Sequence, residues 1–157
     1  MKKVFSIVIV FILLFSMSLP VFSESEKMVI SESIEYLDDG GYIVTTLSVD
    51  EECYTTRATV AKTGSKKVVI YNDDDEALVT MKLTATFNYT GTSATCTNVS
   101  PTFTVHNSYW RVTKSTGTKS GNKGIGEFTA KHYVLGIPVQ TRDVTITITC
   151  SNTGVLS

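Results

Sequence analysis

The stretch ALVTMKLTATFNY, residues 77–89, decides the fold class, because its apolar and polar side chains alternate at every second position. Leu83, Ala85, Phe87 and Tyr89 share one side, and two threonines and an asparagine between them share the other. A period of two is that of a β-strand, whereas a helix repeats its apolar positions every three or four residues. The stretch therefore predicts a half-buried antiparallel strand with one face in a core and one in water.

Segments of the same kind lie on both sides of this stretch, in a chain rich in Thr, Val, Ile, Tyr and Phe. An Asp39-Gly40 pair marks a tight hairpin turn between the first two segments, because glycine adopts the positive φ that such turns need. Many short strands at this spacing predict an all-β fold, an antiparallel β-sandwich that is Ig-like in architecture, with a barrel as the alternative. The expected strands are 28–36, 42–49, 66–71, 77–89, 93–99, 102–106, 109–115, 126–134 and 139–150.

The N-terminus has the pattern of a secretory signal peptide. Lys2 and Lys3 precede an uncharged apolar run over residues 4–22, and Val21 and Ser23 are small enough for the positions before a cut. We expect cleavage after Ser23 and secretion to the extracellular space. The alternative is an uncleaved anchor, because about 20 apolar residues suffice to span a bilayer.

Cleavage leaves 134 of the 157 residues, which is the size of one domain with a sizeable core. The expected divisions are 1–23 signal peptide, 24–50 N-terminal hairpin, 51–65 linker and 66–157 β-sandwich domain. Loss of Lys2 and Lys3 changes the formal net charge from −1 to −3. This balance gives no electrostatic footprint for nucleic acid or an anionic membrane, and no stable membrane span is expected after cleavage.

The three cysteines predict one disulfide and one free thiol. Cys96 and Cys150 lie on the apolar sides of their strands, whereas Cys53 lies among glutamates and threonines. We therefore expect a disulfide between Cys96 and Cys150, and a free thiol at Cys53. Chain-entropy reasoning gives the loop closed by this disulfide a stabilisation of about 4 kcal/mol.

Few residues could carry chemistry, and the sequence predicts no catalytic set, no metal site and no cofactor. His106 and His132 alternate with strand residues, which favours surface or strand-end positions over a catalytic base. The acidic run 73–76 fits a hairpin turn better than a calcium loop, since it lacks alternating ligand spacing and an internal glycine.

Two further features concern ligands. Tyr109 and Trp110 could form an aromatic platform for a sugar ring, although a lone tryptophan in a small β domain more often lies in the core. A carboxylate pair drawn from residues 73–76, Glu127 or Asp143 could hydrolyse a glycosidic bond, but no spacing in the sequence selects the pair.

The part of the chain from residue 66 to 157 resembles a group of small exported all-β proteins of Gram-positive bacteria that have no assigned function. The resemblance rests on a Phe-x-Tyr-x-Gly segment leading to a cysteine, a tryptophan, a Leu-Gly turn and a last strand closing on a second cysteine. The corresponding residues are Phe87, Tyr89, Gly91, Cys96, Trp110, Leu135, Gly136, Cys150, Gly154, Leu156 and Ser157. The resemblance implies a bacterial host and supports the pairing of Cys96 with Cys150; Cys53 lies outside the matching region.

The function expected from these features is that of a secreted, non-enzymatic binding or surface-interaction module. Its expected partner is a glycan or protein of the cell envelope or of a host surface, because exported β domains with no catalytic set usually act through strands and loops. The alternatives are a small secreted hydrolase acting on glycans and a membrane-active β protein.

Overall fold

The computed structural model describes residues 27–50, 53–54 and 59–157. The predicted signal peptide, with its cleavage after Ser23, lies outside the described residues, as does the side chain of Cys53. The described chain is all-β. Its strands are β1 (Met28–Tyr36), β2 (Tyr42–Val49), β3 (Cys53–Tyr54), β4 (Val60–Tyr71), β5 (Ala77–Tyr89), β6 (Ala94–Val105), β7 (Trp110–Ser120), β8 (Lys123–Val134) and β9 (Ile137–Thr149).

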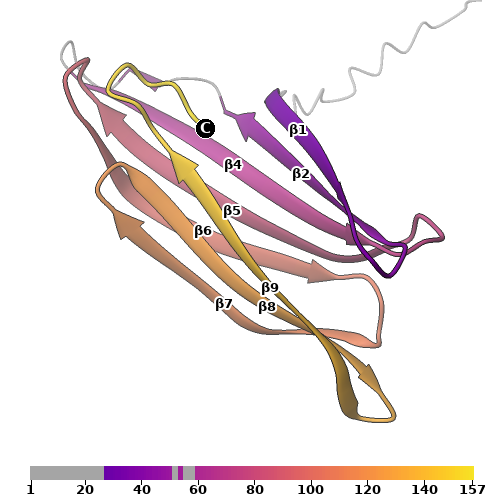
Figure 1. The fold of residues 1–157 in the computed structure, drawn as a ribbon. Helices are drawn as coiled ribbons and strands as arrows, with labels where there is room; N and C mark the ends of the chain where they lie inside the picture. The colour runs from indigo at the N-terminus through magenta and orange to yellow at the C-terminus, as the bar shows by residue number, and fades with distance from the viewer. Residues whose placement is uncertain (1–26, 51–52, 55–58) are drawn as a thin grey trace, which may run out of the picture.

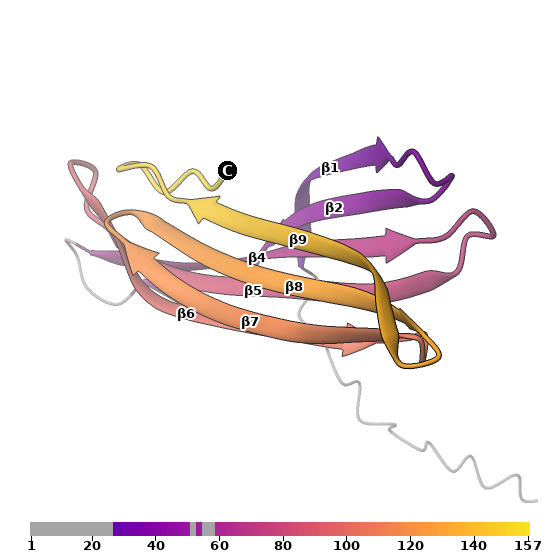
Figure 2. The ribbon, with the colours of Figure 1, turned by 60° about the horizontal axis from the view of Figure 1, so that its bottom comes forward.

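The strands form two antiparallel sheets that pack face to face (Figure 1). The large sheet has the order β1-β2-β4-β5-β6, with the short β3 paired to β4, and the small sheet has the order β7-β8-β9. Apart from β3, neighbours in space are neighbours along the chain, which is the connection pattern of a meander. The small sheet covers β4, β5 and β6, whereas β1 and β2 extend beyond its β9 edge (Figure 2).

The alternation that predicted the fold is confirmed in β5, where Leu83, Ala85 and Phe87 are fully buried between the sheets. The predicted first hairpin is also confirmed, since β1 and β2 pair from Tyr36 and Tyr42 outward. Gly40 has a φ of 87° at its turn. Each buried leucine or phenylalanine side chain contributes about 1.5–3 kcal/mol to folding, so the buried face of β5 makes a substantial contribution to the stability of the core.

Two strands run further than the sequence indicated. β4 begins at Val60, within the region 51–65 expected to be a linker, and it pairs with β2 over eight residues, so the hairpin and β4 share one sheet. β6 runs without a break from Ala94 to Val105, although Pro101 lies in its middle. A proline lacks the N–H that a central strand needs, but β6 is an edge strand and pairs only with β5.

Gly117 and Gly124 belong to strands, although the sequence indicated a loop from 117 to 124, and Gly126 lies in a strand as predicted. They allow the two sheets to approach each other closely: a Cβ atom on Gly124 would lie 2.8 Å from the Cβ of Ala85, and one on Gly126 would lie 2.8 Å from Cδ1 of Leu83. The connecting turn is reduced to Gly121 and Asn122. We call this the closed end of the molecule.

The C-terminal residues complete the closed end. Cys150 and Leu156 form an isolated antiparallel β-bridge. The backbones of Thr149 and Ser157 exchange hydrogen bonds of 2.9 and 3.0 Å. Leu156 is buried, and a Cβ on Gly64 would lie 2.4 Å from its Cδ1. The C-terminal residues therefore cover β4 at this end of the core.

Candidate functional site

A cavity of about 250 Å³ lies at the other end of the two sheets, which we call the open end. The inward positions of β8 and β9 change character there: Phe128 and Val144 pair in the core, the next row pairs Ala130 with Arg142, and the last pairs His132 with Gln140. The core thus gives way to polar groups along the same two strands. The cavity is lined by Leu37, Asp39, Gly41, Ile70, Tyr71, Asn72, Asp73, Leu78, Asn107, Trp110, His132, Gln140 and Arg142.

Asp39 ties the two sheets together across this cavity. Its Oδ2 accepts a hydrogen bond of 2.7 Å from Nε2 of Gln140 and one of 2.6 Å from Nη2 of Arg142. The hydrogen bond from Gln140, and then that of Arg142 with its charge, hold the pKa of Asp39 below its ordinary value. The turn of the first hairpin is thereby fixed over β9, and Asp39 remains an ionised acceptor at neutral pH. We call these three residues the clamp.

An aromatic row lies beside the clamp. Trp110, His132 and Gln140 are direct partners across β7, β8 and β9. The rings of Trp110 and His132 stack with centroids 5.3 Å apart and planes 8° apart. Tyr109 meets His132 edge-on at 6.4 Å and is 62% exposed, whereas Trp110 is only 5% exposed. Of the predicted platform, Trp110 therefore belongs to the core with an edge on the cavity, and Tyr109 stands in solvent at its rim.

A second hollow, of about 480 Å³, adjoins the first and shares Leu37 and Arg142 with it. It runs between the edge of β9, from Arg142 to Ile146, and the part of the large sheet that the small sheet leaves uncovered. Ile43 and Val68 give it an apolar floor, and Glu35 and Lys66 give it charged walls. The two hollows together form a groove that an extended ligand could follow.

With this geometry in view, we compared the chain with known proteins. No family model, curated protein or solved structure matches it. The assignment of the site therefore depends on the side chains and their contacts.

The acidic groups weighed for hydrolysis lie in separate contacts. Glu127 forms an ion pair of 2.6 Å with Lys114, and Asp143 accepts a hydrogen bond of 2.6 Å from Thr129, both on the outer face of the small sheet. The run 73–76 forms a turn: the backbone N–H groups of Asp74 and Glu76 both donate hydrogen bonds to Oδ1 of Asn72. Asp73 lines the cavity, and Asp143 lines the adjoining hollow.

The described residues hold no group of three or more His, Cys, Asp or Glu arranged to bind a metal ion. They also contain no helix with the length and apolar character needed to cross a membrane. His106 lies on the outer face of the large sheet, where its Nε2 is 2.9 Å from the hydroxyl of Thr80.

Cys96 and Cys150 both lie in the core at the closed end, and both are free thiols in this structure. Their backbone N–H groups donate to adjacent carbonyls of one turn: Cys96 to Gly121 at 2.8 Å and Cys150 to Asn122 at 3.0 Å. Burial raises the pKa of each thiol. The pairing of these two cysteines stays a prediction, as does the free thiol at Cys53.

Sequence reasoning identified Tyr109 and Trp110 but missed the clamp. Gln140 and Arg142 extend the inward-facing series of Val144, Ile146 and Ile148 back along β9, so a change from apolar to polar at a fixed period of two was the readable signal. Asp39 carried no such signal, because it lies in a turn about a hundred residues away from its partners.

Proposed function

We propose that the chain is a secreted, non-enzymatic binding protein whose open end takes a saccharide unit of a cell-envelope or host-surface glycan. The observation that carries this proposal is the convergence of the clamp and the aromatic row on one cavity. A sugar presents adjacent hydroxyls that each donate and accept a hydrogen bond, together with an apolar ring face. Planar polar side chains and aromatic rings complement these two features.

The state of the clamp supports binding. Asp39 holds Gln140 through Nε2 and Arg142 through Nη2, which fixes both side chains before any ligand arrives. Side chains that are already ordered lose little conformational entropy on binding. Within the described residues, the Oε1 of Gln140 and the remaining guanidinium N–H groups of Arg142 make no hydrogen bond, and we assign them to sugar hydroxyls.

The size of the site supports a short glycan segment. Ligand pockets for drug-sized molecules are usually about 300–1,000 Å³. The cavity, at about 250 Å³, suits a single ring, and the adjoining hollow of about 480 Å³ suits the units that follow it. A glycan would therefore enter at Tyr109 and run past Arg142 along the β9 edge.

The ionisation of Asp39 argues against this residue as the general acid of a glycosidase. A general acid needs a carboxyl that holds its proton near neutral pH, so its pKa must be raised. The pKa of Asp39 is lowered instead, by Gln140 and Arg142. Secretion after cleavage at Ser23 and an Ig-like layered architecture remain part of the same proposal.

The test is a glycan array followed by calorimetry with the best ligand. We expect Arg142→Gln and Gln140→Ala each to weaken binding about tenfold or more, because each removes a preorganised hydrogen-bonding group. The matched control is Glu127→Gln, which changes a carboxylate on the outer face of β8 and should leave affinity unchanged. Absence of any bound glycan would refute the proposal, and turnover of the bound glycan that is lost in Asp39→Asn would replace it with a hydrolase.

A further inference from the structure

The outer face of the large sheet carries an unusual placement of charge. Lys67 on β4 and Lys82 on β5 are direct partners across the two strands. Both alternate with inward-facing residues and so point to the same outer face. Like charges directly opposite each other destabilise a sheet. Along this row, the neighbours on β2 and β6 are Thr46 and Thr102, which offer hydroxyls instead of a neutralising charge.

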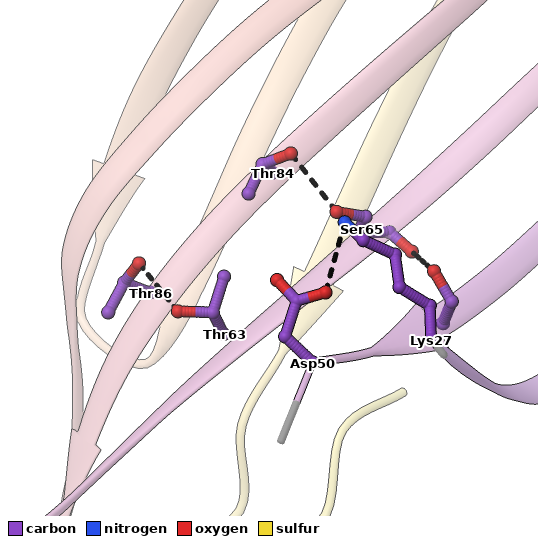
Figure 3. A network of polar contacts seen from close by, with 7 residues as sticks. Lys27, Asp50, Thr63, Ser65, Thr84 and Thr86 are labelled. Carbon is purple, nitrogen blue, oxygen red and sulfur yellow. Dashed lines mark hydrogen bonds and ion pairs between the residues drawn. The ribbon is translucent and has the colours of Figure 1, made fainter. Parts of the chain in front are cut away.

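A third ammonium group reaches the same face. Lys27, just before β1, places its Nζ 3.0 Å from Oδ1 of Asp50 (Figure 3). That oxygen is buried and meets Lys27 as a charge contact, not as an aligned hydrogen bond. Burial of Lys82, and then the neighbouring charge of Lys27, lower the pKa of Lys82; Lys67 acts in the same direction and Asp50 opposes them.

Within the part of the chain that the structure describes, the carboxylates near this cluster are fewer than its ammonium groups. Asp50 faces Lys27 and Lys82, and Glu32, at the β1 edge of the same row, accepts a bond of 3.5 Å from Thr46. Among residues 27–50 and 59–157, three ammonium groups thus share two carboxylates, one of which lies at the sheet edge. Counted over these described residues, the cluster is locally positive on a chain whose formal net charge is −1.

Pairs of hydroxyl groups occupy the next two rows of the same outer face, on one side of Lys67 and Lys82. Figure 3 shows two pairs across β4 and β5: Ser65 with Thr84 at 3.1 Å, and Thr63 with Thr86 at 3.0 Å. Ser65 is only 2% exposed although it lies on the outer face. Hydroxyls that rotate to donate, set beside ammonium groups, are the donors that an oxyanion with several oxygens accepts.

We propose that Lys27, Lys67 and Lys82 form a binding site for a phosphate group on the outer face of the large sheet. An anion between the three ammonium groups would remove their mutual repulsion. This explains why two lysines, Lys67 and Lys82, lie directly opposite each other in the sheet. The same chemistry fits inorganic phosphate and the phosphodiester of a polymer. The site lies on the opposite face of the large sheet from the groove and is independent of the proposed glycan binding.

The experiment titrates the secreted protein with inorganic phosphate in one arm and with a soluble oligomer of glycerol phosphate in the other. We expect saturable binding that weakens with added salt, because exposed charges are screened. Lys82→Gln should weaken it about tenfold or more, and Lys82→Arg should retain it. Lys82→Gln removes a repulsive charge, so loss of folding is not expected. The matched control is Lys114→Gln, on the other sheet and paired with Glu127, which should bind as the parent does.

A second readout is the lysine side-chain titration followed by NMR. Phosphate should raise the pKa of Lys82 and leave that of Lys114 unchanged. Tighter binding of the oligomer per phosphate group identifies a polymer as the source, and equal binding identifies free phosphate. The proposal is overturned if neither probe saturates, or if Lys114→Gln loses as much affinity as Lys82→Gln.

Discussion

The closed and open ends of the molecule are built from the same strands, yet they differ in what lies between the sheets. At the closed end, Gly124 and Gly126 on β8 face Ile148 and Ile146 on β9, and the sheets approach closely. At the open end, the same two strands present His132 and Gln140. Small residues with apolar partners bring the layers together, whereas large polar residues keep them apart.

The two ends therefore differ in their expected roles in stability and in binding. The closed end holds Cys96, Cys150 and the buried Leu156, and it stabilises the fold. The open end holds ionised and hydrogen-bonding groups around a cavity, and it is available for a ligand. Changes at the closed end should therefore act on stability, and changes at the open end should act on binding.

The largest expected effect is at the closed end, from the predicted disulfide between Cys96 and Cys150. Its formation should raise the free energy of unfolding by about 4 kcal/mol over the reduced protein, through restriction of the unfolded chain. The measurement is denaturant unfolding with and without reductant, with the Cys96→Ala/Cys150→Ala variant as the reference that reductant cannot change.

Thiol labelling separates a disulfide from mere burial. Buried thiols with a raised pKa react slowly in the folded protein, so labelling must also be done in denaturant without reductant. One label, lost in Cys53→Ala, is expected for protein purified without reductant. Three labels would show that the closed end is held by packing alone.

The next effect concerns the close approach of the sheets at Gly124. Gly124→Val places a Cβ 2.8 Å from the Cβ of Ala85, and neither atom can move without its backbone. Overpacking of this kind costs about 1–3 kcal/mol. Glu127→Val, on the opposite face of the same strand, gains the same β propensity without the clash and is the control. Equal stabilities of the two variants in thermal unfolding would contradict a tightly packed closed end.

The sequence predicted the all-β class and the buried side of β5, since both depend on local alternation that a chain displays residue by residue. It failed at Gly117 and Gly124, which resemble turn residues. A glycine that permits close packing and a glycine that permits a turn look the same in one sequence. The difference depends on Ala85 and Val99, which lie on another sheet.

The candidate site was predictable only in part for a related reason. Tyr109 and Trp110 were identifiable because aromatic residues are conspicuous, and the polar start of β9 was readable from its period. The clamp and the lysine cluster depend on pairing between distant segments: Asp39 with Arg142, and Lys27 with Asp50 and Lys82. Such pairing follows from strand order, which no local pattern specifies.

The smallest expected effect is at the open end and is a dependence of stability on pH through Asp39. The pKa of Asp39 is lower in the folded protein than its ordinary value of about 3.9, so the unfolded chain binds the proton more readily. The contribution of Asp39 to stability is therefore complete above that ordinary value and is lost as the pH falls through the lowered one. The side chain is 46% exposed, so solvent screening keeps this contribution small. Unfolding midpoints of the parent and Asp39→Asn should differ slightly at neutral pH and converge in acid. A gap that widens in acid would mean that the clamp does not hold Asp39 ionised, and the open end would then lose its preorganised acceptor.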